Sequence, residues 1–381
     1  MPKSASFITS FSIYLIICII EFALAIEWNK VKPMYLVSMY PAPPSMQQDD
    51  NKFDNNNPVV LNLEKETMPD EMITKEAMNR IFGGNEAHQN SFTYQVGFLL
   101  QRPKGLYWCG GSLISPEYVL TAAHCVDMAS RALVFLGAHD IKNAHEPGQI
   151  RMMVYHRDFL IYPTWNPRRL KDDIALVHLP KSVKYNERIQ PIQLPKRDYE
   201  YRNFDDKLGI ASGWGRYATG VHAISNILRY VQLRIVNGQT CKNNFPLSYR
   251  TTNICTSGRF QKSTCNGDSG GPLVLQRRTS KKRVLVGITS FGSIFGCDRG
   301  YPAAFTKVAS YLDWIWDETG IDPNVDVTKR FPFNKAIKEN FREKKKKKFA
   351  NLNLANKNKD KTESIGVIDT RLRKYPDAEV F

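Results

Sequence analysis

Short runs of apolar residues recur between residues 81 and 320 of this chain, and Gly, Pro and Asn turns separate them. Runs of this length and spacing are typical of β-strands rather than helices. The predicted strands cover residues 94–100, 119–122, 174–178, 210–213, 229–235 and 284–289. Many short strands in one region predict an all-β sandwich or a pair of barrels.

One helix is predicted at the end of this region. Val308, Leu312, Ile315 and Trp316 are spaced so that they form a single apolar face of a helix. The pattern stops at Gly320, and we place the end of the domain there. The domain therefore covers residues 81–320.

Residues 1–25 have the three regions of a secretory signal peptide, with Lys3, an apolar run over 13–20 and small residues up to Ala25. We therefore expect a secreted, extracellular protein. The alternative is an uncleaved membrane anchor, because residues 7–26 are just long enough to cross a bilayer. Removal of the signal also removes Cys18, which leaves six of the seven cysteines for an oxidising compartment.

Two segments flank the domain and differ from it in composition. Residues 26–80 carry six basic and nine acidic residues without a periodic apolar pattern, so we expect a loosely ordered acidic prosegment. Residues 321–381 carry 16 basic and nine acidic residues, including the run 344–348 of five lysines. Because so little apolar surface can be buried there, we expect a disordered basic tail.

The net charge of +16 on 381 residues comes from the domain and the tail. Net charge informs about partners and solubility rather than fold. We keep as one alternative a polyanion-binding protein that acts through the tail, while the secretory signal argues against a specific nucleic-acid partner. The composition, with 42% hydrophobic residues, excludes a collagen, a coiled coil and a multipass membrane protein.

The candidate chemistry begins with Ser269, which lies in a glycine-rich sequence, Gly267-Asp268-Ser269-Gly270-Gly271. A serine nucleophile needs a base, and His124 stands directly after an expected strand and before Cys125. A carboxylate must then orient the imidazole. Asp173 and its neighbour Asp172 are the candidates.

The sequences TAAHC, DIAL and GDSGGP, in this order, resemble those of chymotrypsin-like serine proteases throughout residues 81–320. The resemblance implies two packed six-stranded antiparallel β-barrels with a C-terminal helix, and peptide hydrolysis through an acyl-enzyme. It assigns His124 as general base, Asp173 as the orienting carboxylate and Ser269 as nucleophile. The N–H groups of Gly267 and Ser269 would form the oxyanion hole.

The same resemblance implies that the protein is a zymogen. Cleavage after Arg80 by a trypsin-like protease would free the ammonium group of Ile81, which would pair with Asp268. The prosegment lacks cysteine and is expected to leave, or alternatively to stay bound electrostatically. The implied disulfides are Cys109–Cys125, Cys241–Cys255 and Cys265–Cys297.

For the specificity pocket, the resemblance selects Ser263, Ser290, Gly292 and Ala303, an uncharged set that favours aromatic or large apolar residues before the cleaved bond. Asp298 lies nearby in sequence and leaves open a preference for basic residues before the cleaved bond. Residues 300–308 resemble the arthropod chymotrypsin-like and collagenolytic enzymes.

We expect protein or peptide substrates, protein inhibitors as further partners, a monomer, and neither metal nor cofactor. The rival from another class is a protease-like binding protein that has lost catalysis. Such proteins normally have a broken triad, whereas His124, Asp173 and Ser269 are all present here.

Overall fold

The computed structural model describes residues 26–34, 36–38, 84–221, 223–276 and 282–325. The expected signal peptide, the cleavage site at Arg80 and Ile81, and the tail beyond residue 325 lie outside the described residues. Within the described part of the chain, no helix is both long and apolar enough to cross a membrane.

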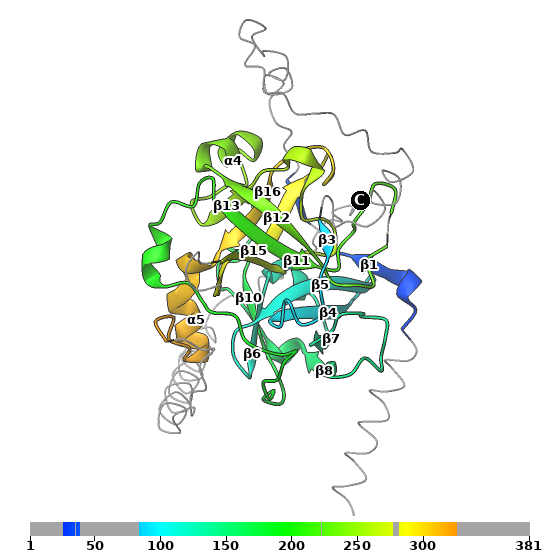
Figure 1. The fold of residues 1–381 in the computed structure, drawn as a ribbon. Coiled ribbons are helices and arrows are strands. Elements are labelled where there is room, and N and C mark those ends of the chain that lie inside the picture. The colour runs from blue at the N-terminus through cyan, green and yellow to red at the C-terminus, as the bar shows by residue number, and fades with distance from the viewer. Residues whose placement is uncertain (1–25, 35, 39–83, 222, 277–281, 326–381) are drawn as a thin grey trace, which may run out of the picture. The chain divides into compact units, whose positions relative to one another are not determined.

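The first of two sheets contains eight strands in the order β8-β7-β4-β5-β6-β10-β9, with β1 added beside β5 (Figure 1). Its strands are β1 (Val31–Pro33), β4 (Gln95–Arg102), β5 (Gly105–Leu113), β6 (Tyr118–Thr121), β7 (Arg131–Leu136), β8 (Ile150–Tyr155), β9 (Phe159–Ile161) and β10 (Ala175–His178). All of these pairings are antiparallel except that of β1 with β5, which is parallel.

The second sheet closes on itself. Its central strands follow the order β11-β14-β15-β16-β13-β12, and β12 pairs in turn with β11. β3 pairs with β12, and β2 pairs in parallel with β15. The strands are β2 (Leu36–Ser38), β3 (Asn85–Glu86), β11 (Leu208–Gly213), β12 (Arg229–Val236), β13 (Asn253–Thr256), β14 (Pro272–Gln276), β15 (Arg283–Ser293) and β16 (Ala303–Lys307).

Helical segments are short and lie between the strands or at the end of the domain. The α-helices are α3 (Ala123–Val126), α4 (Gly238–Asn244) and α5 (Leu312–Thr319). The 3-10 turns are η1 (Trp28–Lys30), η4 (His156–Asp158), η5 (Arg197–Glu200), η6 (Arg259–Gln261) and η7 (Val308–Tyr311).

The all-β prediction is confirmed, and each of the six predicted strands overlaps an observed one. The terminal helix is also found, but its first turn is the 3-10 turn η7. Val308, Leu312 and Ile315 are buried, whereas Trp316 is 39% exposed. A 3-10 helix has 3.0 residues per turn, whereas an α-helix has 3.6. The 3-10 turn therefore shifts Trp316 away from the face expected for a continuous α-helix.

Large aromatic side chains fill the first sheet and contact the second. Trp108 on β5 packs against Phe135 on β7, with ring centroids 5.2 Å apart. It also meets Trp214, which directly follows β11, edge to face at 5.8 Å. Both tryptophans are fully buried. This contact packs the two sheets closely against each other.

Residues 26–38 differ from the expectation of a loosely ordered prosegment. They form η1, β1 and β2, and they contribute a strand to each sheet. Two three-residue strands leave too short a pattern to be detected in a sequence. Their conformation is set by pairing with β5 and β15 instead of by local preference.

The loop between β7 and β8 is organised around one buried carboxylate. Glu146 accepts hydrogen bonds from the backbone N–H groups of His139 and Asp140 and forms an ion pair of 3.0 Å with Arg188. Gly148 makes room for this arginine, because a Cβ there would lie 2.6 Å from the Arg188 Cδ. The guanidinium thus compensates a carboxylate that is only 4% exposed.

Candidate active site

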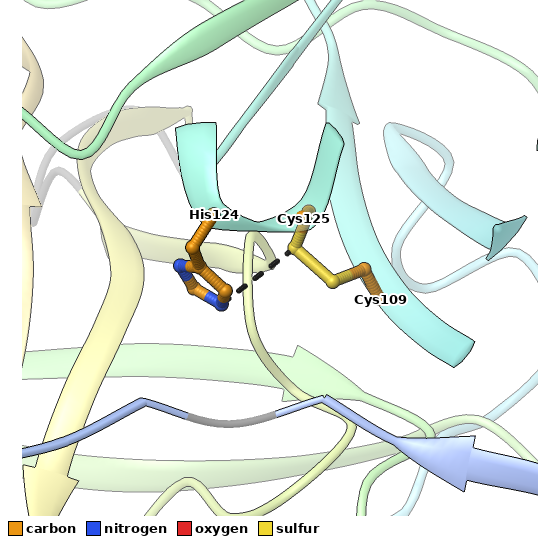
Figure 2. Close-up of side chains that lie close together, drawn as sticks. All are labelled: Cys109, His124 and Cys125. Atoms are coloured by element: carbon orange, nitrogen blue, oxygen red, sulfur yellow. Dashed lines mark hydrogen bonds between the residues drawn. A yellow bond between two sulfur atoms is a disulfide. The ribbon is translucent and has the colours of Figure 1, made fainter. Parts of the chain in front are cut away.

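His124 lies in the one-turn helix α3, directly after β6. The disulfide between Cys109 on β5 and Cys125 fixes this turn to the sheet, and Figure 2 shows the imidazole beside it. The ring is almost completely buried, at 3% exposure. Its position is therefore set by covalent and packing constraints before any substrate binds.

Asp173 precedes β10 and faces the His124 ring. Its Oδ2 lies 2.7 Å from His124 Nδ1, and its Oδ1 accepts a hydrogen bond of 2.9 Å from the His124 backbone N–H. Ser290 donates to Oδ2 at 2.5 Å, and the Thr306 hydroxyl donates to the Asp173 carbonyl at 2.8 Å. The Ser290 hydroxyl and the His124 backbone N–H hold the carboxylate at the imidazole, while Thr306 fixes the backbone of Asp173. A carboxylate at this position favours a proton on Nδ1 and leaves Nε2 as the basic nitrogen.

The neighbouring Asp172 faces a different part of the molecule. Its Oδ1 accepts a hydrogen bond of 2.9 Å from the Tyr311 hydroxyl, and the Thr164 hydroxyl donates to its other oxygen. Its backbone has a φ of 59°, so the chain turns sharply between the two aspartates. The structure thus separates them, with only Asp173 at the imidazole.

Ser269 lies in the turn that leads into β14. Its hydroxyl donates to the backbone carbonyl oxygen of Met34 at 2.9 Å, and the Gly267 N–H donates to the same oxygen at 2.8 Å. Gly267 has a φ of 96°, a conformation that other residues rarely adopt. The Gly267 N–H therefore already points at a bound carbonyl oxygen, as an oxyanion-hole donor must.

The structure pairs all six cysteines of the domain in the way that the resemblance implies: Cys109–Cys125, Cys241–Cys255 and Cys265–Cys297. Ligand atoms of Cys109, His124 and Cys125 lie within 4.8 Å of one another, a spacing that would suit a metal ion. Both sulfurs belong to the disulfide, however, and a metal needs free thiolates. The cluster braces the histidine instead.

Three of the expected pocket residues lie on two paired strands. Ser290 and Gly292 flank Phe291 on β15. The register partner of Phe291 on β16 is Ala304, which directly follows Ala303. Ser290 also holds Asp173, so this strand links the expected pocket to the buried carboxylate.

Ser263 is buried in the segment before Ser269, and the disulfide Cys265–Cys297 ties this segment to the chain after β15. Asp298 directly follows that disulfide. It accepts a hydrogen bond of 2.7 Å from the Thr219 hydroxyl. The Asp298 carboxylate, which could have attracted a basic substrate side chain, is therefore already hydrogen-bonded to another loop.

Known proteins match the region that carries these residues. The trypsin family model matches residues 81–315, which is more than half of the chain. The chain belongs to the trypsin family. Brachyurin from Leptuca pugilator is 39% identical to this trypsin-family chain over 243 residues, which cover 64% of the chain and all of that protein. Collagenase from Hypoderma lineatum is 36% identical and covers 64% of the chain and 88% of that protein.

A solved structure agrees with the fold of this trypsin-family protein. HL collagenase, solved at 1.7 Å resolution, matches with a TM-score of 0.56 and 35% identity over 64% of this chain and all of the solved one. Cathepsin G from Mus musculus is 35% identical and covers 64% of this chain and 87% of that protein. Together these similarities show that the protein is a serine endopeptidase, with proteins or peptides as substrates.

Asp268 is a buried carboxylate beside the serine of this trypsin-family site. It accepts hydrogen bonds of 2.9 Å from the N–H groups of Gly215 and Cys265. Among the described residues it forms no ion pair. Burial therefore raises the pKa of its carboxyl group to about 7.

Two features of the trypsin-family site have no signal in the sequence. Thr306 fixes the backbone of Asp173, but a threonine inside a strand gives no signal of that contact. Met34 meets Ser269 although 235 residues separate them, and nothing in its neighbourhood marks it as part of the site. Both contacts depend on the folded arrangement of distant strands.

Proposed function

We propose that the protein is a secreted zymogen whose Ser269 becomes the nucleophile of an endopeptidase after cleavage at Arg80. The observation that carries this proposal is the buried hydrogen bond of 2.7 Å between His124 Nδ1 and Asp173 Oδ2. It orients a base of the right tautomer in a protein that the family comparison shows to be a serine endopeptidase.

In the proposed reaction, Ser269 Oγ attacks the substrate carbonyl carbon while its proton moves to His124 Nε2. The Asp173 carboxylate stabilises the imidazolium that forms. The N–H groups of Gly267 and Ser269 bind the negative charge on the carbonyl oxygen. The imidazolium then protonates the leaving amine, and water hydrolyses the acyl-enzyme with His124 again as base.

Activation is proposed to work through Asp268. The new ammonium group of Ile81 would pair with this buried carboxylate, which has no cationic partner among the described residues. A buried charge without a partner is unfavourable, so the ion pair would stabilise the segment between Cys265 and Ser269. The raised pKa of the Asp268 carboxyl in the uncut chain supports this role.

We propose further that the enzyme cleaves after aromatic or large apolar residues. Ser263, Ser290, Gly292 and Ala303 offer no charge to a substrate side chain, and the carboxylate of Asp298 is bonded to Thr219. The enzyme would then cut poorly after its own Arg80. A trypsin-like protease is therefore the proposed activator.

The test uses the secreted precursor cut after Arg80 by immobilised trypsin. We expect hydrolysis of peptides with Phe, Leu or Met before the cleaved bond, and loss of this activity in Ser269→Ala. Absence of hydrolysis in the cut wild-type protein even at high dilution, where a noncovalently bound prosegment would dissociate, would favour the protease-like binding protein. Selectivity for Arg that disappears in Asp298→Ala would overturn the pocket assignment and give Asp298 that role.

A further inference from the structure

Residues 26–38 cross the candidate active site and join both sheets there. β1 pairs in parallel with β5, through Val31 and Leu106 to Pro33 and Trp108. β2 pairs in parallel with β15, beginning with Leu36 and Phe291. Figure 1 shows β1, in blue, beside β5. Met34, which directly follows β1, places its backbone carbonyl oxygen at the Ser269 hydroxyl.

The backbone of Met34 is the central contact. Its N–H donates to the Trp108 carbonyl at 3.1 Å, while its own carbonyl oxygen accepts from Gly267 and Ser269. Met34 thus forms backbone hydrogen bonds with Trp108 on β5 and with Gly267 beside the serine. This is β-strand addition, a mode in which backbone pairing provides affinity and the side chains provide specificity.

Apolar side chains anchor the segment on either side of Ser269. The Trp28 ring lies 5.9 Å from that of Trp108 and 6.2 Å from that of Phe135. Val31 and Met34 follow at intervals of three residues, and each is only 6% exposed. Burial of apolar side chains of this size stabilises the contact with the domain.

On the other side of Ser269, Leu36 packs against a cluster that includes Leu170 and Phe291. These side chains lie beside the strand that carries Ser290 and Gly292. A peptide substrate that used this strand would have to displace Leu36 and β2. The segment and a substrate therefore compete for the same surface.

The arrangement at Ser269 is unsuited to cleavage of the segment. The hydroxyl proton points at the Met34 carbonyl oxygen, and no hydrogen bond joins Ser269 Oγ to His124 Nε2 among the described residues. Attack would need Oγ to approach the carbonyl carbon while the imidazole takes the proton. The bound carbonyl thus occupies the donor of the oxyanion hole without being positioned for reaction.

We propose that residues 26–38 are a built-in inhibitor that fills the catalytic cleft and stays bound after cleavage at Arg80. This inference rests on the proposed role of Ser269. The only cysteine before residue 81 is Cys18, which lies in the expected signal peptide, so the binding is noncovalent once Arg80 has been cut. Cleavage then removes the high effective concentration of a tethered segment, and inhibition becomes dependent on dilution.

Electrostatic attraction does not account for this binding. Residues 26–38 contain two lysines and one glutamate, so the segment is itself slightly basic, like the domain. Glu27 pairs with Lys30 of the same segment at 2.7 Å. Lys32 lies 5.9 Å from the centre of the Tyr107 ring and Arg102 donates a hydrogen bond to the Met34 sulfur. The remaining contacts to the domain are backbone pairs and apolar side chains, which salt does not screen.

The test compares three forms of the precursor after cleavage at Arg80 by immobilised trypsin. They are the wild type, a Trp28→Ala/Val31→Asp variant that loses two anchors, and a control, Asn29→Ala, whose side chain is exposed. The readout is the rate at which a small serine-directed phosphonate labels the protein. We expect the anchor variant to react at least tenfold faster than the wild type and the control.

A second arm does not depend on the folding of a variant. Synthetic peptide 26–38 is added to wild-type protein that has been cut at Arg80 and separated from its own segment by gel filtration at high dilution. We expect competitive inhibition of peptide hydrolysis that persists in 1 M NaCl, with the peptide recovered intact by mass spectrometry. A peptide carrying the Trp28→Ala and Val31→Asp changes should inhibit at least tenfold less.

Equal labelling rates in all three proteins, rapid cleavage of the added peptide, or loss of inhibition in salt would each overturn the proposal. Absence of labelling in every form would contradict the proposed function of Ser269 instead. The two failures are therefore distinguishable.

Discussion

Ser269 donates its hydroxyl hydrogen bond to the backbone carbonyl oxygen of Met34, a residue 235 positions earlier in the chain. The serine proposed as nucleophile is thus bonded to the prosegment and not to its base, His124. The same carbonyl accepts the N–H of Gly267. Among the described residues, an assembled His124–Asp173 pair therefore coexists with a Ser269 hydroxyl that is hydrogen-bonded to Met34.

Replacement of Asp173 by Asn should lower kcat by about 10³–10⁴-fold in the activated enzyme. The oxygen of the Asn side chain would accept from the His124 backbone N–H, so its NH2 group would face Nδ1 as a donor. The histidine then loses both its tautomer and the stabilisation of its charge. Steady-state hydrolysis of a Phe-containing peptide measures the effect. The matched control is Asp172→Asn, which should retain activity within a few-fold, and equal losses in the two variants would contradict the assignment.

The uncut precursor should lose stability as the pH rises from about 4 to 7 through Asp268. Burial raises the pKa of this carboxyl from 3.8 to about 7. In that window the native state binds more protons than the unfolded state, so the free energy of unfolding falls with pH and the loss is complete above pH 7.

Urea unfolding of the precursor in a Ser269→Ala background measures this change, with Asp268→Asn as the comparison. The Asn variant should gain roughly 4 kcal/mol relative to Asp268 between pH 4 and pH 8. Cleavage at Arg80 should abolish the difference, because the Ile81 ammonium would then compensate the charge. A parallel pH dependence in both proteins would argue against a buried carboxylate without a partner.

Arg188→Ala should destabilise the protein by about 3 kcal/mol, because it leaves the buried Glu146 carboxylate without its cation. Thermal unfolding of the precursor is the measurement. The double variant Arg188→Ala/Glu146→Gln should recover part of that loss, since it no longer buries a charge. If the two substitutions are simply additive, the ion pair does not organise the loop between β7 and β8.

Ser263→Asp should shift the preference before the cleaved bond from Phe toward Arg by about 100-fold or more. A buried carboxylate in an otherwise uncharged pocket is unfavourable beside an apolar side chain and favourable beside a guanidinium. The ratio of kcat/KM values for two peptides that differ only at this residue reports the shift. Ser263→Ala should keep the apolar preference, and an unchanged ratio in Ser263→Asp would place Ser263 outside the pocket.

Sequence patterns predicted the structure correctly where it depends on residues within one strand or one helix. The run 284–289, which lies within β15, is rich in β-branched residues, and Gly320 ends α5 with a φ of 71°. The family resemblance favoured Asp173 over Asp172, and the physical difference between them is the turn at Asp172.

Patterns were insufficient where tertiary contacts decide the structure. Trp316 is exposed because the preceding turn is a 3-10 turn, which apolar spacing does not reveal. The strands β1 and β2 each have three residues and form by pairing with strands far along the chain. The composition of the prosegment therefore gives no indication of its contact with Ser269.

The central claim is that Ser269 is the nucleophile of a serine endopeptidase that His124 activates. Its most direct test is reaction of the Arg80-cut protein with a serine-directed phosphonate, followed by peptide mapping in the mass spectrometer. We predict a single adduct on Ser269 in the wild type and at least 10³-fold slower labelling in His124→Ala. An adduct on another residue, or labelling that does not depend on His124, would contradict the account.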